Sequence, residues 1–293
     1  MIRSQLAAAL LAAIGTALPA PGREPVRVVN AVCPAPALHQ AERHVIVILP
    51  PSYDRQITRR YPVIVFLHGQ PGNPGDWLDK GRLPRLLGRL ESSGRMPEVI
   101  ALAPDANGTH GRSYYLNAPD GRDDMETFLT GDLIAWADRT FRTRADARDR
   151  ALVGISDGAS AALDLTFRHP DRFGACAGHS GSYDLRWSPR LQPLVGAYPA
   201  ARSCLASHSP LRYAASMAPR LRGLDIWFDC GLLDGAFADD RQLDRVLRSA
   251  LVPHVYEEWL GWHGWSFWRR RLAQSLPFVT RDMRQPPAAR RRT

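Results

Sequence analysis

The sequence predicts an α/β fold in which one mostly parallel sheet is covered by helices on both faces. Continuous apolar runs bounded by turn residues recur along the chain, as in strands that are buried on both faces. These runs alternate with longer amphipathic stretches, which is the pattern of strands joined by helices. The 293 residues, 45% of them hydrophobic and 23% charged, are enough to bury a large core.

The predicted strands are short, rich in β-branched residues and closed by Gly, Pro or Asp. They cover residues 26–32, 44–50, 62–69, 98–104, 150–156, 173–181, 224–231 and 254–261. Amphipathic spacing predicts helices at 83–93, 125–141, 157–170, 239–251 and 266–276. Segment 105–124 reads as a long loop, and 182–222 shows no clear periodicity, so whether it forms a lid stays open.

The two ends of the chain differ in composition from the rest. Arg3, an apolar run from Leu6 to Leu18 and then small residues and prolines form the layout of a secretory signal peptide over residues 1–20. A bilayer span needs about 20 apolar residues, so we expect cleavage near Ala17 or Ala20 rather than an anchor; a short N-terminal helix is the alternative. We therefore expect a secreted, periplasmic or cell-envelope protein with one domain at 24–280 and a flexible basic tail at 281–293.

The formal net charge is +9, and Lys80 is the only lysine, so the positive charge is almost all arginine. Nucleic-acid binding would call for basic residues interleaved with aromatics or for a known motif, and neither is present in the sequence. We expect a solvated surface with weak attraction to an anionic envelope. The sequence has no zinc, nucleotide or EF-hand motif, so no metal or cofactor is expected.

Export would place the four cysteines in an oxidising compartment. None belongs to a CxxC pair, so structural disulfides or buried thiols are favoured over metal ligands. The four residues are Cys33, Cys176, Cys204 and Cys230.

The segment from Gly154 to Gly158 matches G-x-S-x-G directly after a predicted strand and directly before a predicted helix. The glycines allow a sharp turn that exposes the hydroxyl of Ser156 above the sheet. The motif therefore predicts a nucleophile at Ser156, with an ordinary helix N-cap as the alternative.

A serine nucleophile needs a base, and the base needs an acidic partner. His263 follows the last predicted strand and precedes the last helix. Asp234 follows the preceding strand, which completes the chain order Ser, Asp, His. We prefer Asp234 because Asp229 lies within a strand, whereas Asp239 and Asp240 fall where helix caps are expected.

Two backbone N–H groups should stabilise the oxyanion. One would come from Asp157, the residue after the nucleophile. The other should come from the loop after 62–69, where Pro71 has no N–H, which leaves Gln70 as the donor. We expect His68 to order this loop by hydrogen bonding rather than to transfer protons.

Several segments resemble an esterase family of α/β-hydrolases that includes S-formylglutathione hydrolases, feruloyl esterases, enterochelin esterases and the mycolyltransferases of mycobacteria. They are ILPPSYD, YPVIVFLHG, GDLIAWADRTFRT, LVGISDGASAAL, HPDRFGACAGHSG, SHSP and GWHGWSFWRRRL. The resemblance covers most of the chain after the leader. It implies the α/β-hydrolase fold and the same nucleophile, acid and base: Ser156, Asp234 and His263.

The chain also departs from that family. Ala159 stands where members often have a second glycine, and Asp157 stands where they have an uncharged residue. The sequence leaves three roles open for Asp157. Its carboxylate would disfavour negative charge in the oxyanion hole, or it would point away from the site as the first residue of a helix, where the dipole favours it. In the third role it would bind a polar group of the substrate. Loop position makes four residues candidates for the substrate pocket, although aromatic loop residues more often pack in the interior: Trp77, His110, Tyr114 and Tyr115.

These patterns predict an exported serine esterase that cleaves carboxylic esters of small molecules, lipids or carbohydrates through an acyl-enzyme, without a cofactor. The mycolyltransferase resemblance also permits acyl transfer to a sugar or lipid hydroxyl. A non-catalytic envelope-binding protein is the third interpretation, because a fold does not fix a function. The acyl and alcohol groups and the oligomeric state stay open.

Overall fold

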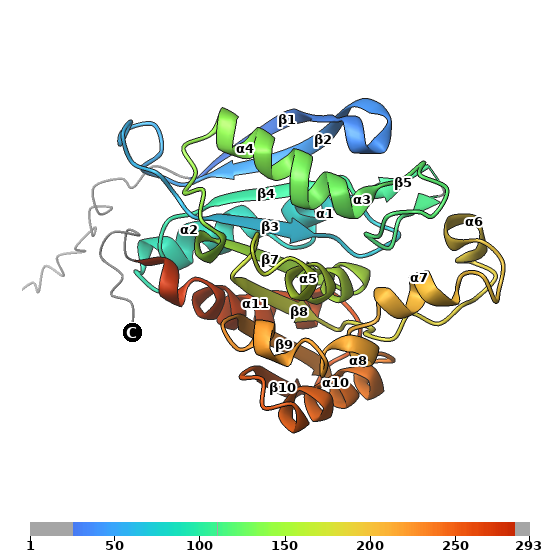
Figure 1. Ribbon diagram of the computed structural model, residues 1–293. Helices are drawn as coiled ribbons and strands as arrows, with labels where there is room; N and C mark the ends of the chain where they lie inside the picture. The colour runs from blue at the N-terminus through green and yellow to red at the C-terminus, as the bar shows by residue number, and fades with distance from the viewer. Residues whose placement is uncertain (1–25, 110, 285–293) are drawn as a thin grey trace, which may run out of the picture.

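A computed structural model describes residues 26–109 and 111–284 of the chain. Its centre is an eight-stranded sheet in the order β1-β2-β4-β3-β7-β8-β9-β10 (Figure 1). The strands are β1 (Arg27–Ala35), β2 (Gln40–Leu49), β3 (Val63–Leu67), β4 (Ile100–Pro104), β7 (Arg150–Ile155), β8 (Ala175–His179), β9 (Asp225–Gly231) and β10 (Val255–Trp259).

The six strands from β4 to β10 pair in parallel, and the antiparallel hairpin of β1 and β2 extends the sheet beside β4. Every residue of β3, β4, β7 and β8 is buried, which agrees with their continuous apolar sequence. The predicted fold class is thus confirmed. Because parallel strands end at the same edge, the loops after β3, β7, β9 and β10 meet there.

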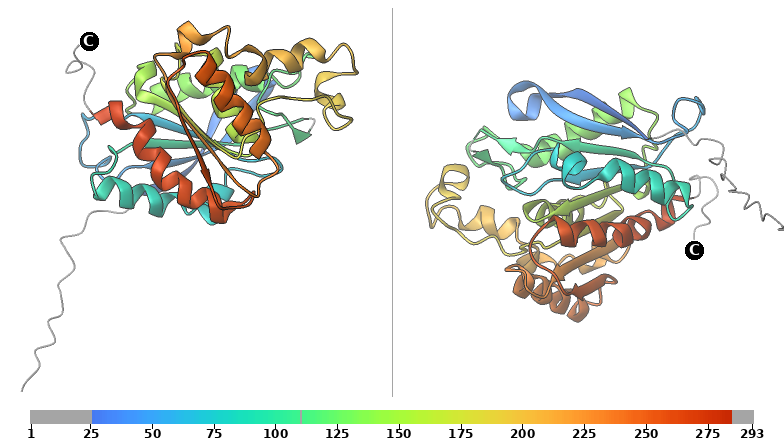
Figure 2. Two further views of the ribbon diagram at one scale, coloured as in Figure 1. Left: turned by 90° about the horizontal axis from the view of Figure 1, so that it is seen from below. Right: turned by 180° about the vertical axis from the view of Figure 1, so that it is seen from behind.

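Helices cover both faces of this sheet (Figure 2). One face packs against α5 (Asp157–Arg168), α10 (Phe237–Ser249) and a continuous helical stretch made of α3 (Met125–Thr127), a π-helical turn (Phe128–Asp132) and α4 (Leu133–Thr140). The other face packs against α1 (Asp76–Asp79), α2 (Leu83–Ser92) and α11 (Trp265–Val279). The helices expected from the amphipathic stretches are therefore all present.

The predicted long loop 105–124 and segment 182–222, which has no clear periodicity, form only small elements. The 105–124 loop contains the two-residue strands β5 (Asn107–Gly108) and β6 (Gly111–Arg112). Segment 182–222 forms the short helices α6 (Gln192–Val195), α7 (Arg202–Ser207), α8 (Pro210–Tyr213) and α9 (Ala218–Leu221). Of these, α6 and α7 project beyond the edge of the sheet (Figure 1).

Three expectations concern the two ends of the chain and the cysteines. The expected signal peptide at 1–20 lies outside the described residues. The first residues of the expected tail form a 3₁₀ turn (Arg281–Arg284) with Met283 buried, because this side chain joins the apolar cluster under α11. All four cysteines are free thiols, so the disulfide alternative is wrong for this structure.

The remaining short 3₁₀ turns are Pro36–Leu38 and Ala147–Asp149. Within 26–109 and 111–284 no helix is long and apolar enough to cross a bilayer.

Candidate active site

Ser156 lies on a sharp turn between β7 and α5, as the G-x-S-x-G motif predicts. Its backbone is strained, with φ 54° and ψ −125°, a combination that L-residues rarely adopt. A Cβ on Gly154 would lie 1.9 Å from the carbonyl oxygen of Gly158, and one on Gly158 would lie 2.2 Å from that of Leu67. The turn therefore needs both glycines, and it directs the Ser156 hydroxyl out of the sheet.

The hydroxyl of Ser156 contacts a histidine rather than capping its own helix. Ser156 Oγ lies 2.9 Å from Nε2 of His263, and no side-chain cap bond is formed at the start of α5. Nδ1 of His263 lies 2.9 and 3.0 Å from the two carboxylate oxygens of Asp234. Asp234 lies in the loop after β9, and His263 lies in the loop after β10. The three residues predicted from sequence therefore meet at one edge of the sheet and form one hydrogen-bonded chain.

The Asp234 carboxylate is held by further donors. Burial alone would raise its pKa, but the hydrogen bonds from His263, from the Ala236 N–H and from the Ser180 hydroxyl together hold the pKa below its ordinary value. Ser180 in turn accepts a 3.0 Å hydrogen bond from the indole N–H of Trp268. The carboxylate is therefore ionised and fixed in position, as an acid that orients a histidine must be.

Sequence reasoning missed Ser180, which lies just after β8 and adopts a φ of 61°. Its side chain is buried, and its own N–H donates to the Asp229 carbonyl at 2.8 Å. A serine in a Gly-Ser rich segment carries no signal for this role, because its partners come from β9, the loop after β9, and α11.

The segment Gly69–Gln70 passes directly beside Ser156. A Cβ on Gly69 would lie 3.1 Å from the Cβ of Ser156, so a larger residue at this position would crowd the nucleophile. The Gln70 side chain anchors the segment by donating to the Ala106 carbonyl at 2.9 Å and accepting from the Tyr114 N–H at 3.0 Å. This places the Gln70 backbone N–H near the nucleophile, where an oxyanion donor is required.

His68 orders the same loop, as expected. Its Nδ1 lies 3.0 Å from the Gly69 carbonyl oxygen, so this nitrogen carries the proton, and Nε2 accepts from the Ala106 N–H at 3.2 Å. The ring is fully buried, and burial lowers its pKa. His68 is therefore a neutral structural histidine away from the reacting atoms.

Asp157 is the first residue of α5, and its side chain, 23% exposed, lies beside the nucleophile. Burial raises the pKa of Asp157, although the charges of Arg112 and His263 act in the opposite direction. The backbone N–H of Gln70 also hydrogen-bonds to this carboxylate. One of the two expected oxyanion donors is thus engaged by the Asp157 carboxyl group in the free protein.

The four candidate pocket residues have different positions. Trp77 is fully buried against Phe66 and Trp265, and Tyr115 is buried with its hydroxyl donating to the His68 carbonyl, so neither lines a pocket. Both expectations are wrong because these loops fold back and place their aromatic rings in the interior. Tyr114 does line a cavity, and His110 lies outside the described residues.

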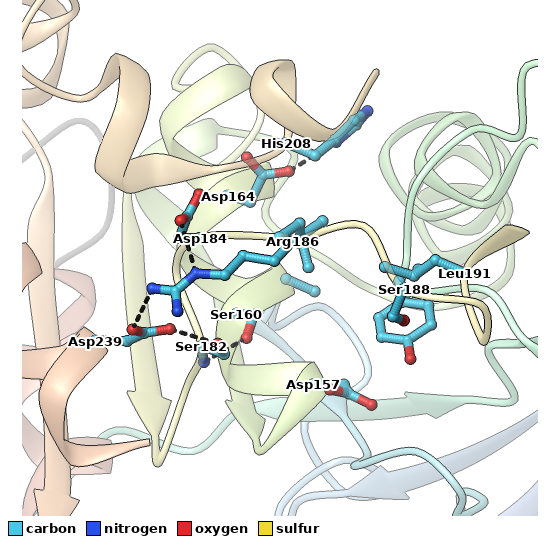
Figure 3. A pocket seen from close by; sticks show the side chains of 13 residues that line it. Asp157, Ser160, Asp164, Ser182, Asp184, Arg186, Ser188, Leu191, His208 and Asp239 are labelled. Atoms are coloured by element: carbon cyan, nitrogen blue, oxygen red, sulfur yellow. Dashed lines mark hydrogen bonds and ion pairs between the residues drawn. The ribbon is translucent and has the colours of Figure 1, made fainter. Parts of the chain in front are cut away.

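That cavity, of about 280 Å³, begins at Asp157 and lies between α5 and the segment after β8 (Figure 3). Its lining is mostly polar and carries four carboxylates. They are Asp157, Asp164, Asp184 and Asp239, and the other lining side chains include Ser160, Ser182, Arg186 and His208. A polar, acidic space therefore lies beside Asp157, the residue after the nucleophile, and neither Ser156 nor His263 is among its lining residues.

The segments that carry Asp234 and His263 expose apolar side chains. Half of the exposed large apolar side chains of the described residues belong to the end of β10 and to the loops after β9 and β10, and a 2.9 Å bond from the Leu232 N–H to the Trp259 carbonyl joins these segments. They are Leu232, Leu233, Trp259, Leu260 and Trp262. The His263 side chain is 42% exposed beside them, so ligands and water can reach the site from solvent.

Among the described residues, no group of three or more His, Cys, Asp or Glu side chains is arranged to hold a metal ion. The chemistry that the described side chains support is nucleophilic attack by Ser156 with proton transfer through His263.

Comparison with known proteins finds relatives of this chain. The chain is 24% identical to an uncharacterized protein of Corynebacterium glutamicum over 238 residues, 80% of this chain and 56% of that one. It is 32% identical to an esterase of Mycobacterium tuberculosis over 140 residues, 48% of this chain and 29% of that one. The chain thus spans about half or less of these relatives.

Solved structures are similar over greater lengths. A ferulic acid esterase superposes with a TM-score of 0.80 at 27% identity, covering 88% of this chain and 99% of that one. An S-formylglutathione hydrolase of Agrobacterium tumefaciens has a TM-score of 0.70 at 19% identity, covering 87% and 95%. A family model described as "Putative esterase" matches residues 36–279. The chain therefore belongs to this esterase family of the α/β-hydrolase fold.

Proposed function

We propose that this chain is a serine hydrolase of carboxylic esters. The observation that carries the proposal is the hydrogen-bonded chain from Ser156 Oγ through the imidazole of His263 to Asp234. Removal of the Ser156 proton by a positioned base is what makes a hydroxyl reactive at neutral pH. Membership of the esterase family supports the same reaction.

In the first half-reaction Ser156 Oγ bonds to the ester carbonyl carbon while its proton passes to Nε2 of His263. The backbone N–H groups of Asp157 and Gln70 would then stabilise the oxyanion. Collapse breaks the bond to the alcohol oxygen, which takes the proton from His263, and Asp234 stabilises the transient imidazolium. In the second half-reaction His263 takes a proton from water while the water oxygen bonds to the acyl carbon. The bond from that carbon to Ser156 Oγ then breaks, Oγ takes the proton back from His263, and the acid is released.

The test is hydrolysis of 4-nitrophenyl esters from acetate to palmitate by the mature chain, Ser156→Ala and the exposed-serine control Ser216→Ala. We expect Ser156→Ala to lose at least about 10⁴-fold in kcat/KM and Ser216→Ala to match the wild type. A fluorophosphonate probe should label the wild type and Ser216→Ala only. If no ester is cleaved and no label is taken up, the chain is not a serine esterase, and a non-catalytic envelope-binding protein takes its place.

Acyl transfer is the second candidate, because the exposed His263 imidazole can activate an alcohol in place of water. Adding glycerol or a monosaccharide during 4-nitrophenyl ester turnover separates the two. New acyl esters of the acceptor would identify a transferase, whereas free acid as the only product would identify a hydrolase.

We also propose export, on the signal-peptide layout of residues 1–20. Expression of the full chain in a bacterial host should yield a processed protein outside the cytoplasm. Mass spectrometry that finds an intact residue 1 in the recovered protein would overturn this.

A further inference from the structure

The four carboxylates of the cavity beside Ser156 differ in how they are paired. Asp184 accepts from Arg212 at 2.6 Å and from Arg186 at 3.1 Å. Asp239 and Asp164 also have partners: Ser182 donates to Asp239 at 2.6 Å, and His208 lies 2.9 Å from Asp164. Figure 3 shows these bonds as dashed lines, except the one from Arg212, which is not drawn, and no dashed line reaches Asp157.

Asp157 is the carboxylate nearest in sequence to the nucleophile and the least satisfied. Its Oδ2 is inaccessible to water and has no hydrogen-bond partner among residues 26–109 and 111–284. The Arg112 guanidinium lies 3.9 Å from that oxygen, beyond hydrogen-bond distance, and its side chain is partly exposed. A buried carboxylate oxygen without a donor is costly, so its presence in a site calls for an explanation.

The position of this carboxylate has a direct consequence for ester cleavage. Asp157 contacts the Gln70 N–H, which is one of the two donors that would face the oxyanion. With a neutral substrate, the oxyanion would form close to a second negative charge, and the two would repel each other. A substrate that brings a positive charge cancels this repulsion, and the gain is largest in the transition state, where the oxyanion is fully formed.

Resting on the proposed function, we propose that Asp157 is a specificity-determining residue that binds an ammonium group carried by the substrate next to the scissile ester. An ammonium group supplies the missing donor and adds a positive charge closer than that of Arg112, and charge-assisted hydrogen bonds are about twice as strong as neutral ones. A hydroxyl would supply only the donor. The cavity that begins at Asp157 has room for such a group.

The test compares three ethyl esters at pH 7: L-alanine, L-lactate and isobutyrate, whose α-carbons carry an ammonium, a hydroxyl or a methyl group of similar size. For the wild type we expect kcat/KM to fall in that order, with about a tenfold span between the first and the last. In Asp157→Asn the value for the alanine ester should fall and that for the isobutyrate ester should rise. A general loss of folding or catalysis would instead lower both.

A second pair of esters asks whether the charge lies on the alcohol instead: 3-aminopropyl acetate, whose primary ammonium can donate hydrogen bonds, against its neutral isostere butyl acetate. A preference for the charged member in either pair that Asp157→Asn reverses supports the proposal. The pair that shows it tells whether the ammonium group belongs to the acyl group or to the alcohol. Asp184→Asn removes a carboxylate of the same cavity that already has two arginines, so it should change the preference much less.

Three outcomes overturn the inference: no preference for the charged ester in either pair, equal turnover of the lactate and alanine esters, or an unchanged preference in Asp157→Asn. In all three, turnover of 4-nitrophenyl acetate that depends on Ser156 leaves the esterase function intact. If 4-nitrophenyl acetate and every ester of the panel are inert, the proposed function itself fails, and the role of Asp157 fails with it.

Discussion

Ser180 contacts Asp234 and not the substrate-facing atoms, so its contribution should be to hold the acid in position. A hydrogen bond to a charged group is worth about 1.5–3 kcal/mol, so Ser180→Ala should lower kcat/KM for 4-nitrophenyl acetate about 10- to 100-fold. Because the side chain is buried, KM should change little. Steady-state kinetics of the two proteins checks this.

A double-mutant cycle separates positioning from a general effect on folding. In an Asp234→Asn background the Ser180→Ala change should cost almost nothing, because the group that Ser180 holds is already altered. Trp268→Phe, which removes the donor to Ser180, should reproduce part of the loss. Equal losses from Ser180→Ala in both backgrounds would show that Ser180 acts only on the overall fold.

At the scale of single residues, the sequence was informative where backbone geometry and chain order impose a residue type. Ser156 could be located because its turn needs Gly154 and Gly158, and Asp234 and His263 because each follows a strand of the same parallel sheet. Side-chain direction in loops leaves no such pattern. Trp77 and Tyr115 were therefore misplaced, and the partners of Ser180 were not identified.

The first turn of α10 buries a carboxylate that the sequence suggested as a helix cap. Asp240 is fully buried, and neither of its oxygens has a hydrogen-bond partner in the described chain apart from the weakly donating Cys230 thiol. Burial raises its pKa well above the ordinary value, and the charges of Asp229 and Asp234 add to this. The helix therefore carries a cost at neutral pH that its amphipathic pattern does not reveal.

Asp240→Asn should stabilise the protein above the ordinary carboxyl pKa of about 4. Because the folded-state pKa is raised, the folded protein holds a proton that the unfolded chain releases, and stability falls as pH rises from that value through the folded-state pKa. Removing the charge should add about 1 kcal/mol or more to the free energy of unfolding at pH 8. Urea unfolding at pH 5, 7 and 8 measures it.

Asp244→Asn is the matched control on the same helix. This carboxylate is paired with Arg248 at 2.7 Å and with His254 at 3.0 Å, so its removal should bring no gain. If the pH dependence of unfolding is the same in Asp240→Asn as in the wild type, the cost does not come from Asp240.

At the scale of elements, all eight strands of the main sheet and the long helices were predictable. The strands are apolar or β-branched runs closed by turn residues, and the long helices show several repeats of the 3.6-residue period. The short helices α6 to α9 were not, since four to six residues are too few to display a 3.6-residue repeat. The place of β4 between β2 and β3 also depends on tertiary pairing, which no local pattern records.

For the molecule as a whole, the cysteines test whether the fold relies on covalent bonds or on its core. Burial raises the pKa of Cys33 to about 12 and those of Cys176 and Cys230 further, while Cys204 is only partly buried. Since the thiolate is the reactive form, Ellman's reagent at pH 8 should modify Cys204 first in the native protein and all four thiols in urea. A Cys204→Ser variant should take up almost no label before unfolding.

Dithiothreitol should leave the melting temperature unchanged, because the two apolar clusters that sandwich the sheet supply the stability. A lower melting temperature on reduction, or fewer than four thiols in urea, would mean that an exported form of this chain is held by a disulfide instead.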